Sequence, residues 1–331
     1  MDLRTTGSQK WFARFAWFVL LYNIPVILWG AYVRVSFSGD GCGANWPLCG
    51  GGQVIPQHMA TPRLIEFTHR VMTGGDLAVA IIMVLWAFLS FPKRDSVRRY
   101  ASLSLLFLFI EALLGAGLVL FRYVAKDQSA GRAWYLSLHL TNTLLLLGAL
   151  TATAWAASRR TPRIRIFDAP RTVLAGLYVA ILVSVTGAIA ALGDTLFPAS
   201  SIRGGFQQDF SSTSSALLRL RIFHPAIAVL GAAYLIWMTF RFLKRDEESA
   251  ERKAAIGVMT LALFQVVVGA TNISLLAPIW MQLFHLFIAD VLWISLVLLM
   301  LESARALNAI PSVRLRPATT TPLLPEESRS R

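Results

Sequence analysis

Charged residues are scarce in this chain. Asp, Glu, Lys and Arg make up only 15% of its 331 residues, whereas 56% are hydrophobic. Several apolar runs reach roughly 20 residues, the length that crosses a bilayer as a helix. The runs lack the strict polar-apolar alternation of a transmembrane β-strand, and only helices or closed barrels satisfy the backbone in lipid. The composition therefore predicts an all-α polytopic membrane protein.

The apolar runs predict eight transmembrane helices. The first run has the basic flank of a signal peptide, but it is long and no small-x-small cleavage site follows it, which favours a retained helix. The expected spans are approximately residues 13–34, 64–91, 100–121, 134–157, 172–193, 215–240, 254–275 and 279–303.

Acidic residues are also few, 18 against 31 basic ones, which gives a net charge of +13. Most basic residues lie in the tails and loops on one side of the eight-span arrangement. The positive-inside rule makes that side cytoplasmic and explains the charge without nucleic acid. Both termini are then cytoplasmic, with a tail at residues 1–10 and a disordered tail at residues 304–331 that is rich in Pro, Arg, Ser and Thr.

Only two cysteines occur, Cys42 and Cys49, in the Gly-rich stretch GDGCGANWPLCGGG. The topology places this loop outside, where an oxidising compartment permits a disulfide between them. Two interpretations stay open: a structural disulfide, or a redox-active pair that passes electrons or thiol equivalents to a nearby site.

The chain has five histidines, and four of them occupy the same place in four apolar runs. His69, His139, His224 and His285 each lie a few residues inside the start of a run, whereas His58 lies in the first loop and is expected to be an ordinary exposed histidine. An imidazole in hydrocarbon is costly and usually marks function. Four at one depth predict buried metal ligands, as axial ligands to haem iron.

The other four runs carry a matching feature, a Gly-Ala pair near the outer end. Small residues at the depth of the histidines leave room for a planar macrocycle between facing helices. The sequence therefore predicts a duplicated four-helix bundle, residues 11–160 and 161–303. The pairs are Gly30-Ala31, Gly115-Ala116, Gly187-Ala188 and Gly269-Ala270.

Each half offers one histidine pair, His69 with His139 and His224 with His285. Glu66 breaks the equivalence of the halves, because it lies one turn before His69 and would project a carboxylate toward whatever His69 binds. A carboxyl group near a metal centre is a candidate for proton transfer. The alternative is an ion pair with Arg63 or Arg70 at the membrane rim.

The stretch CGANWPLCGG, followed by QVIP and IEFTHR, resembles haem A synthase of the bacterial CtaA/COX15 family, and the similarity extends over residues 11–303. The resemblance implies oxidation of the C8 methyl group of haem O to a formyl group by successive hydroxylations. In the family, the pair matched by His224 and His285 holds a haem b cofactor. The pair matched by His69 and His139 faces the substrate haem, and the residue matched by Glu66 takes part in catalysis.

The resemblance also implies partners and a place in the cell. The expected partners are haem O as substrate, a haem O synthase, an electron donor and the cytochrome oxidase assembly machinery. The expected location is the bacterial plasma membrane, with the haem sites toward the outer side. Both a monomer and a homo-oligomer are compatible with the sequence.

One departure from the family concerns cysteine. Some members carry a second pair in the loop between the fifth and sixth spans, but the stretch GDTLFPASSIRGGFQQDFSSTSS contains none. A mechanism that needs thiols in both halves therefore does not suit this chain.

Other classes of protein compete with the enzyme. A dihaem b-type cytochrome would place histidines at two membrane depths, a haem transporter would show a Trp-rich outer motif, and a purely structural assembly subunit would not need Glu66. Oxidising an unactivated methyl group needs a redox cofactor, because no side chain supplies that chemistry. A haem with two histidine ligands has no open site for oxygen and suits electron transfer.

Overall fold

The computed structural model describes residues 3–49, 60–161, 163–211 and 216–309, and the regular elements of these ranges are all helices. Eight spans among them are long and apolar enough to cross a membrane, which confirms the predicted all-α polytopic fold. The helices are α1 (Leu3–Val35), α2 (Thr61–Ser90), α3 (Ser96–Leu120), α4 (Ala130–Arg159), α5 (Arg171–Leu196), α6 (Ile202–Phe210), α7 (Ala216–Arg221), α8 (Phe223–Leu243), α9 (Ala250–Ser274) and α10 (Ile279–Ala309).

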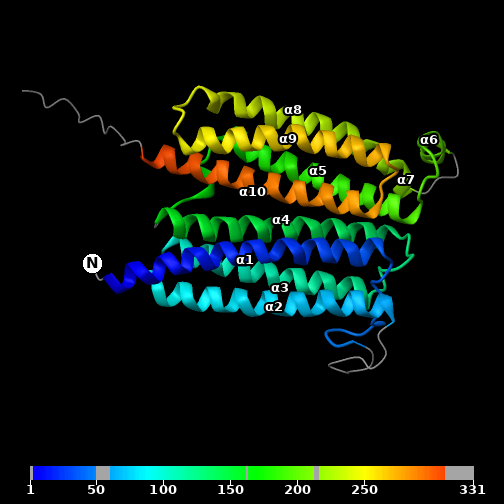
Figure 1. Ribbon diagram of the computed structural model, residues 1–331, viewed down its shortest axis with the longest axis horizontal. Helices are drawn as coiled ribbons and strands as arrows, with labels where there is room; N and C mark the ends of the chain where they lie inside the picture. The colour runs from blue at the N-terminus through cyan, green and yellow to red at the C-terminus, as the bar shows by residue number, and fades with distance from the viewer. Residues whose placement is uncertain (1–2, 50–59, 162, 212–215, 310–331) are drawn as a thin grey trace, which may run out of the picture.

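The spans lie side by side in two groups (Figure 1). Helices α1 to α4 form one group, and α5, α8, α9 and α10 form the other. The N-terminus and the end of α10 lie at one end of the bundle, here called the terminal end. The loop that holds the two cysteines, together with α6 and α7, lies at the opposite end, here called the disulfide end.

Helices α4 and α10 join the two groups, and α4 is the most deeply buried span. The indole Nε1 of Trp293 donates to the Leu144 carbonyl at 2.7 Å, and Trp155 Nε1 donates to Glu302 Oε1 at 2.9 Å. Glu302 also pairs with Arg159 at 2.6 Å. Because an unpaired polar group in a membrane interior is costly, these bonds fix how the groups meet.

The first and last helices are longer than predicted. Helix α1 begins at Leu3, so most of the predicted tail 1–10 is helical, and Ser8 and Gln9 bond to Ser90 at 3.0 and 3.2 Å. Helix α10 continues to Ala309, past the predicted boundary at 303. The remainder of the predicted C-terminal tail, residues 310–331, lies outside the described residues.

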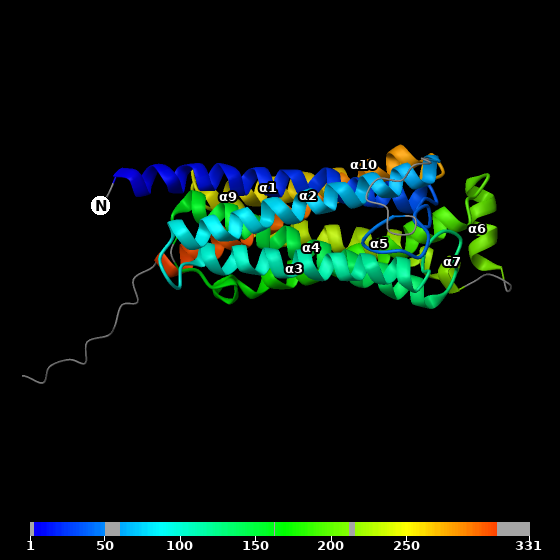
Figure 2. The ribbon, with the colours of Figure 1, turned by 90° about the horizontal axis from the view of Figure 1, so that it is seen from below.

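The loop between the fifth and sixth spans contains the short helix α6, which the sequence did not predict. Figure 2 shows it running across the disulfide end, roughly perpendicular to the spans. The sixth span is also divided, because α7 ends at Arg221 and α8 begins at Phe223. Pro225 has no N–H to donate to the Arg221 carbonyl, which explains a break at this place.

Candidate functional site

The four predicted histidines all lie near the disulfide end. His69, His139 and His285 fall within the first three turns of α2, α4 and α10, and His224 is the second residue of α8. These are the four spans that start at the disulfide end. The fifth histidine, His58, lies outside the described residues.

Each histidine ring packs against a glycine of a neighbouring helix. A Cβ built on Gly30 would lie 2.9 Å from His69 Cε1, and one on Gly187 would lie 3.0 Å from His224 Cε1. Helices α9 and α3 repeat the contact, with 3.1 Å from Gly269 to His285 Cε1 and 3.7 Å from Gly115 to His139 Nε2. At Gly30, Gly187 and Gly269 an added methyl group would press on the ring, so glycine leaves the space that these three rings fill, whereas at Gly115 it would make an ordinary contact.

His139 lies close enough to His69, and His224 to His285, for a charge on one ring to act on the other. That each of these pairs holds a haem stays a prediction. Among the described residues no group of three or more His, Cys, Asp or Glu side chains surrounds a common point that could hold a bare metal ion. Two imidazoles per site match the axial positions of a haem iron.

Glu111 of α3 is a site residue to which the sequence analysis gave no role. Its Oε1 lies 2.7 Å from His139 Nδ1, and its Oε2 accepts from Asn142 Nδ2 at 2.6 Å. The hydroxyl of Thr143 also donates to Oε1. The carboxylate thus fixes the His139 ring and leaves Nε2, on the Gly115 side, as the atom available to a metal.

A signal for Glu111 existed in the sequence. It lies four residues before Gly115, as Gln265 lies four residues before Gly269, and both positions are polar inside apolar runs. Residues four apart share one face of a helix, so the side chain that precedes a histidine-contacting glycine by one turn also faces that histidine.

The second histidine pair has neutral partners. Thr186 donates to the Val183 carbonyl at 2.8 Å, so its oxygen accepts from His224 Nδ1 at 3.1 Å. That tautomer leaves His224 Nε2 as the metal-binding atom. Gln265 Nε2 lies 3.4 Å from His285 Nε2 and donates to the His285 carbonyl at 3.1 Å.

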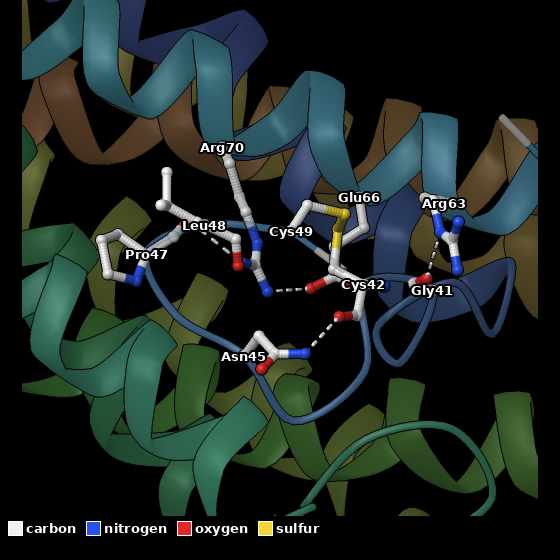
Figure 3. Close-up of a disulfide and its surroundings, with 9 residues drawn as sticks. All are labelled: Gly41, Cys42, Asn45, Pro47, Leu48, Cys49, Arg63, Glu66 and Arg70. Atoms are coloured by element: carbon white, nitrogen blue, oxygen red, sulfur yellow. Dashed lines mark hydrogen bonds and ion pairs between the residues drawn. A yellow bond between two sulfur atoms is a disulfide. The ribbon is translucent and has the colours of Figure 1, made fainter. Parts of the chain in front are cut away.

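Glu66 lies beneath the disulfide loop (Figure 3). One oxygen pairs with Arg70 at 2.6 Å, the other accepts from the Cys42 backbone N–H at 2.8 Å, and the residue is only 3% exposed. The ion pair with Arg70 is the alternative that the sequence left open, and it is the one present. A part for Glu66 in the chemistry stays a prediction.

The predicted disulfide between Cys42 and Cys49 is present, and both residues are buried. Arg70 Nη1 donates to the Pro47 and Leu48 carbonyls at 3.1 and 3.0 Å, so one guanidinium holds both Glu66 and the loop (Figure 3). The approach is close, because a Cβ on Gly41 would lie 2.5 Å from the Pro62 backbone. The loop is therefore fixed to the start of the helix that carries His69.

An eight-span helical membrane protein with two facing pairs of intramembrane histidines is a bundle of the kind that can hold haem between helices. The chain belongs to the COX15-CtaA family of cytochrome oxidase assembly proteins, whose family model matches residues 13–297.

Some relatives of this chain are named haem A synthase, and others are named for the transfer of a farnesyl group to haem. A protein of Thermus thermophilus named protoheme IX farnesyltransferase is 40% identical over 296 residues, 89% of this chain but only 48% of that protein. The chain thus spans about half the length of that relative. A haem A synthase of Staphylococcus saprophyticus is 26% identical over 321 residues, 90% of this chain and 98% of that protein. One from an Exiguobacterium species is 36% identical over 114 residues, 34% of this chain and 38% of that protein.

Proposed function

We propose that this protein is a haem A synthase, which oxidises the C8 methyl group of haem O to a formyl group by successive hydroxylations. The observation that carries the proposal is the fourfold contact between a glycine and a histidine ring, arranged as two histidine pairs. Family membership and the haem A synthase from Staphylococcus, matched over almost its whole length, support it.

His224 and His285 are proposed to hold a b-type haem as cofactor. The fit is supported by the His224 ring, whose Nδ1 is bonded to Thr186 so that Nε2 can bind iron, and by the glycines that leave room for both rings. A haem held by His224 and His285 would supply one-electron transfer. Thr186 orients the His224 imidazole through Nδ1, and Gln265 contacts His285 at Nε2 and at its carbonyl, which leaves His285 Nδ1 without a hydrogen bond to any described residue.

His69 and His139 are proposed to hold the substrate, haem O. Glu111, held in turn by Asn142 and Thr143, fixes the His139 ring through Nδ1. The disulfide loop, fixed by Arg70 and Glu66, covers the start of the helix that carries His69 and limits the entry of water. Glu66 is proposed to exchange a proton with the substrate side when its ion pair with Arg70 opens.

The orientation in the membrane follows from charge. The connections at the terminal end contain Lys93, Arg94, Arg160, Arg163 and Arg245, and α1 begins and α10 ends there. The positive-inside rule supports a cytoplasmic terminal end. The histidine sites and the disulfide then lie toward the outer side of a bacterial plasma membrane, where the disulfide is stable.

The relative in Thermus supports one partner. It is named for transferring a farnesyl group to protoheme IX, and the chain covers only about half of it. We infer that an enzyme which farnesylates haem supplies the substrate. The family description supports a role in cytochrome oxidase assembly, and electron transfer through the second site requires an external redox partner.

A dihaem cytochrome that carries electrons across the membrane is the second candidate. It would need sites at two depths, whereas all four histidines lie near the disulfide end. This placement favours the enzyme over the cytochrome.

The test is extraction of pigment from cells that express the chain together with a haem O synthase and contain no other haem A synthase. Chromatography should show haem A, and cells with the haem O synthase alone should show only haem B and haem O. Haem O without haem A, in cells that hold folded protein in the membrane, would contradict the proposal.

A further inference from the structure

We propose that Glu111 is a positioning residue that makes the two histidine sites unequal in redox potential, with the lower potential at the site of His69 and His139. This inference rests on the proposed function, because it concerns iron bound at those sites.

The carboxylate of Glu111 is held firmly against His139. The oxygen Oε1 lies 2.7 Å from His139 Nδ1, and the side chain of Glu111 is only 15% exposed. Asn142 holds the other oxygen at 2.6 Å and is itself anchored, because its Nδ2 also donates to the Phe107 carbonyl at 2.8 Å. Thr143 adds a contact to Oε1. A carboxylate with this many partners stays in place whatever His139 binds.

The matching place in the other group holds a neutral amide. Gln265 precedes Gly269 by one turn, as Glu111 precedes Gly115, and both glycines contact the histidine of the next span. Gln265 Nε2 lies 3.4 Å from His285 Nε2, whereas Glu111 contacts Nδ1 of its histidine. The Thr186 hydroxyl lies 3.1 Å from His224 Nδ1. Among the described residues, no carboxylate forms a hydrogen bond or ion pair with either histidine of this pair.

This difference has a direct effect on iron. A carboxylate that accepts the Nδ1 proton increases electron donation by the imidazole, and its negative charge stabilises the higher oxidation state in a medium of low dielectric constant. Glu111 therefore lowers the potential of iron bound by His139, and Gln265 has no comparable effect. A single electron shared by haems at both sites would therefore reside at the site of His224 and His285, and an iron held beside Glu111 would favour the oxidised state, which suits an oxidation at the first site.

The experiment is an optical redox titration of purified protein from cells that make haem O, so that both sites are loaded. The wild type should show two midpoint potentials. Glu111→Gln keeps the shape but removes the charge, so it should raise the lower midpoint and leave the upper one in place. The variant Gln265→Glu adds a negative charge beside the His285 ring and should lower the upper midpoint only.

Each outcome of the redox titration either supports or overturns the inference. Unchanged midpoints in Glu111→Gln, or a shift of the upper midpoint instead, would overturn the inference. If Glu111→Gln loses haem, Gln265→Glu becomes the deciding variant, and an unshifted upper midpoint overturns the inference. Wild-type protein that binds no haem at the first site contradicts the proposed function and the inference with it, whereas two equal midpoints in the loaded wild type contradict the inference alone.

Discussion

A histidine ring inside a packed bundle needs a neighbour small enough to admit it. Glycine meets that need at Gly30, Gly187 and Gly269. The sequence predicted small residues at this depth, because glycine and histidine recur at fixed positions in successive apolar runs, but it assigned the space to a macrocycle and not to the rings. Glu111 was harder to assign, since its role depends on which face of one helix meets another. The spacing of residues along the sequence indicates which of them share one face of a helix. How each helix is rotated toward its neighbours depends on the packing of the whole bundle.

At the scale of single residues, we predict that Gly269→Ala weakens haem binding at the site of His224 and His285. The added methyl group would lie 3.1 Å from His285 Cε1, so the ring must shift. Such overpacking costs about 1–3 kcal/mol, which corresponds to a loss of about five- to 150-fold in the affinity for b-type haem. The measurement is the ratio of haem to protein after purification.

Gly257→Ala is the matched control on the same helix. No atom of another residue lies within 4 Å of its added methyl group, and alanine in a helix is favoured over glycine by about 0.5–1 kcal/mol. It should retain haem fully. Equal retention in both variants would show that contact with Gly269 does not position His285.

At the scale of elements, the eight spans could be predicted because length and apolar composition are strong signals in a membrane protein. The residues at which the helices begin and end could not be predicted in this way. Helix α1 starts earlier because Ser8 and Gln9 find partners on α2, and α6 forms in a loop that has no apolar run. Contacts of this kind join residues far apart in the sequence, so no local sequence pattern predicts them.

The disulfide loop is the element that matters most for the first site. Glu66 has two proposed roles there, to hold this loop and to exchange a proton with the substrate side, and we predict that Glu66→Gln separates them. Glutamine can still accept from the Cys42 N–H but cannot pair with Arg70 as an anion. The spectrum of the b-type haem should stay intact while haem O, or a partly oxidised alcohol, accumulates in place of haem A. The measurement is pigment extraction together with an optical spectrum.

The exposed acid Glu248 at the terminal end provides the control, since Glu248→Gln should change neither readout. Full haem A synthesis by Glu66→Gln would limit Glu66 to holding the loop. Loss of the haem spectrum along with activity would point to folding.

At the scale of the whole molecule, two groups of four spans meet through α4 and α10. Bonds from Trp293 and Glu302 fix that meeting, and Arg34 of α1 adds another near the disulfide end, where it donates to the Ala191 carbonyl at 2.8 Å. A rigid joint keeps the two histidine pairs at a constant separation, which the proposed electron transfer between them would require. The sequence predicted two equivalent halves, and their equivalence as repeats stays a prediction.

The central claim is that the two pairs have different occupants, a resident cofactor at His224 and His285 and a substrate at His69 and His139. The most direct test is the haem content of protein purified from cells that make no haem O. The wild type and the double variant His69→Ala/His139→Ala should both show one low-spin b-type haem, and His224→Ala/His285→Ala should show none. Haem retained by the second double variant and lost from the first would contradict the account.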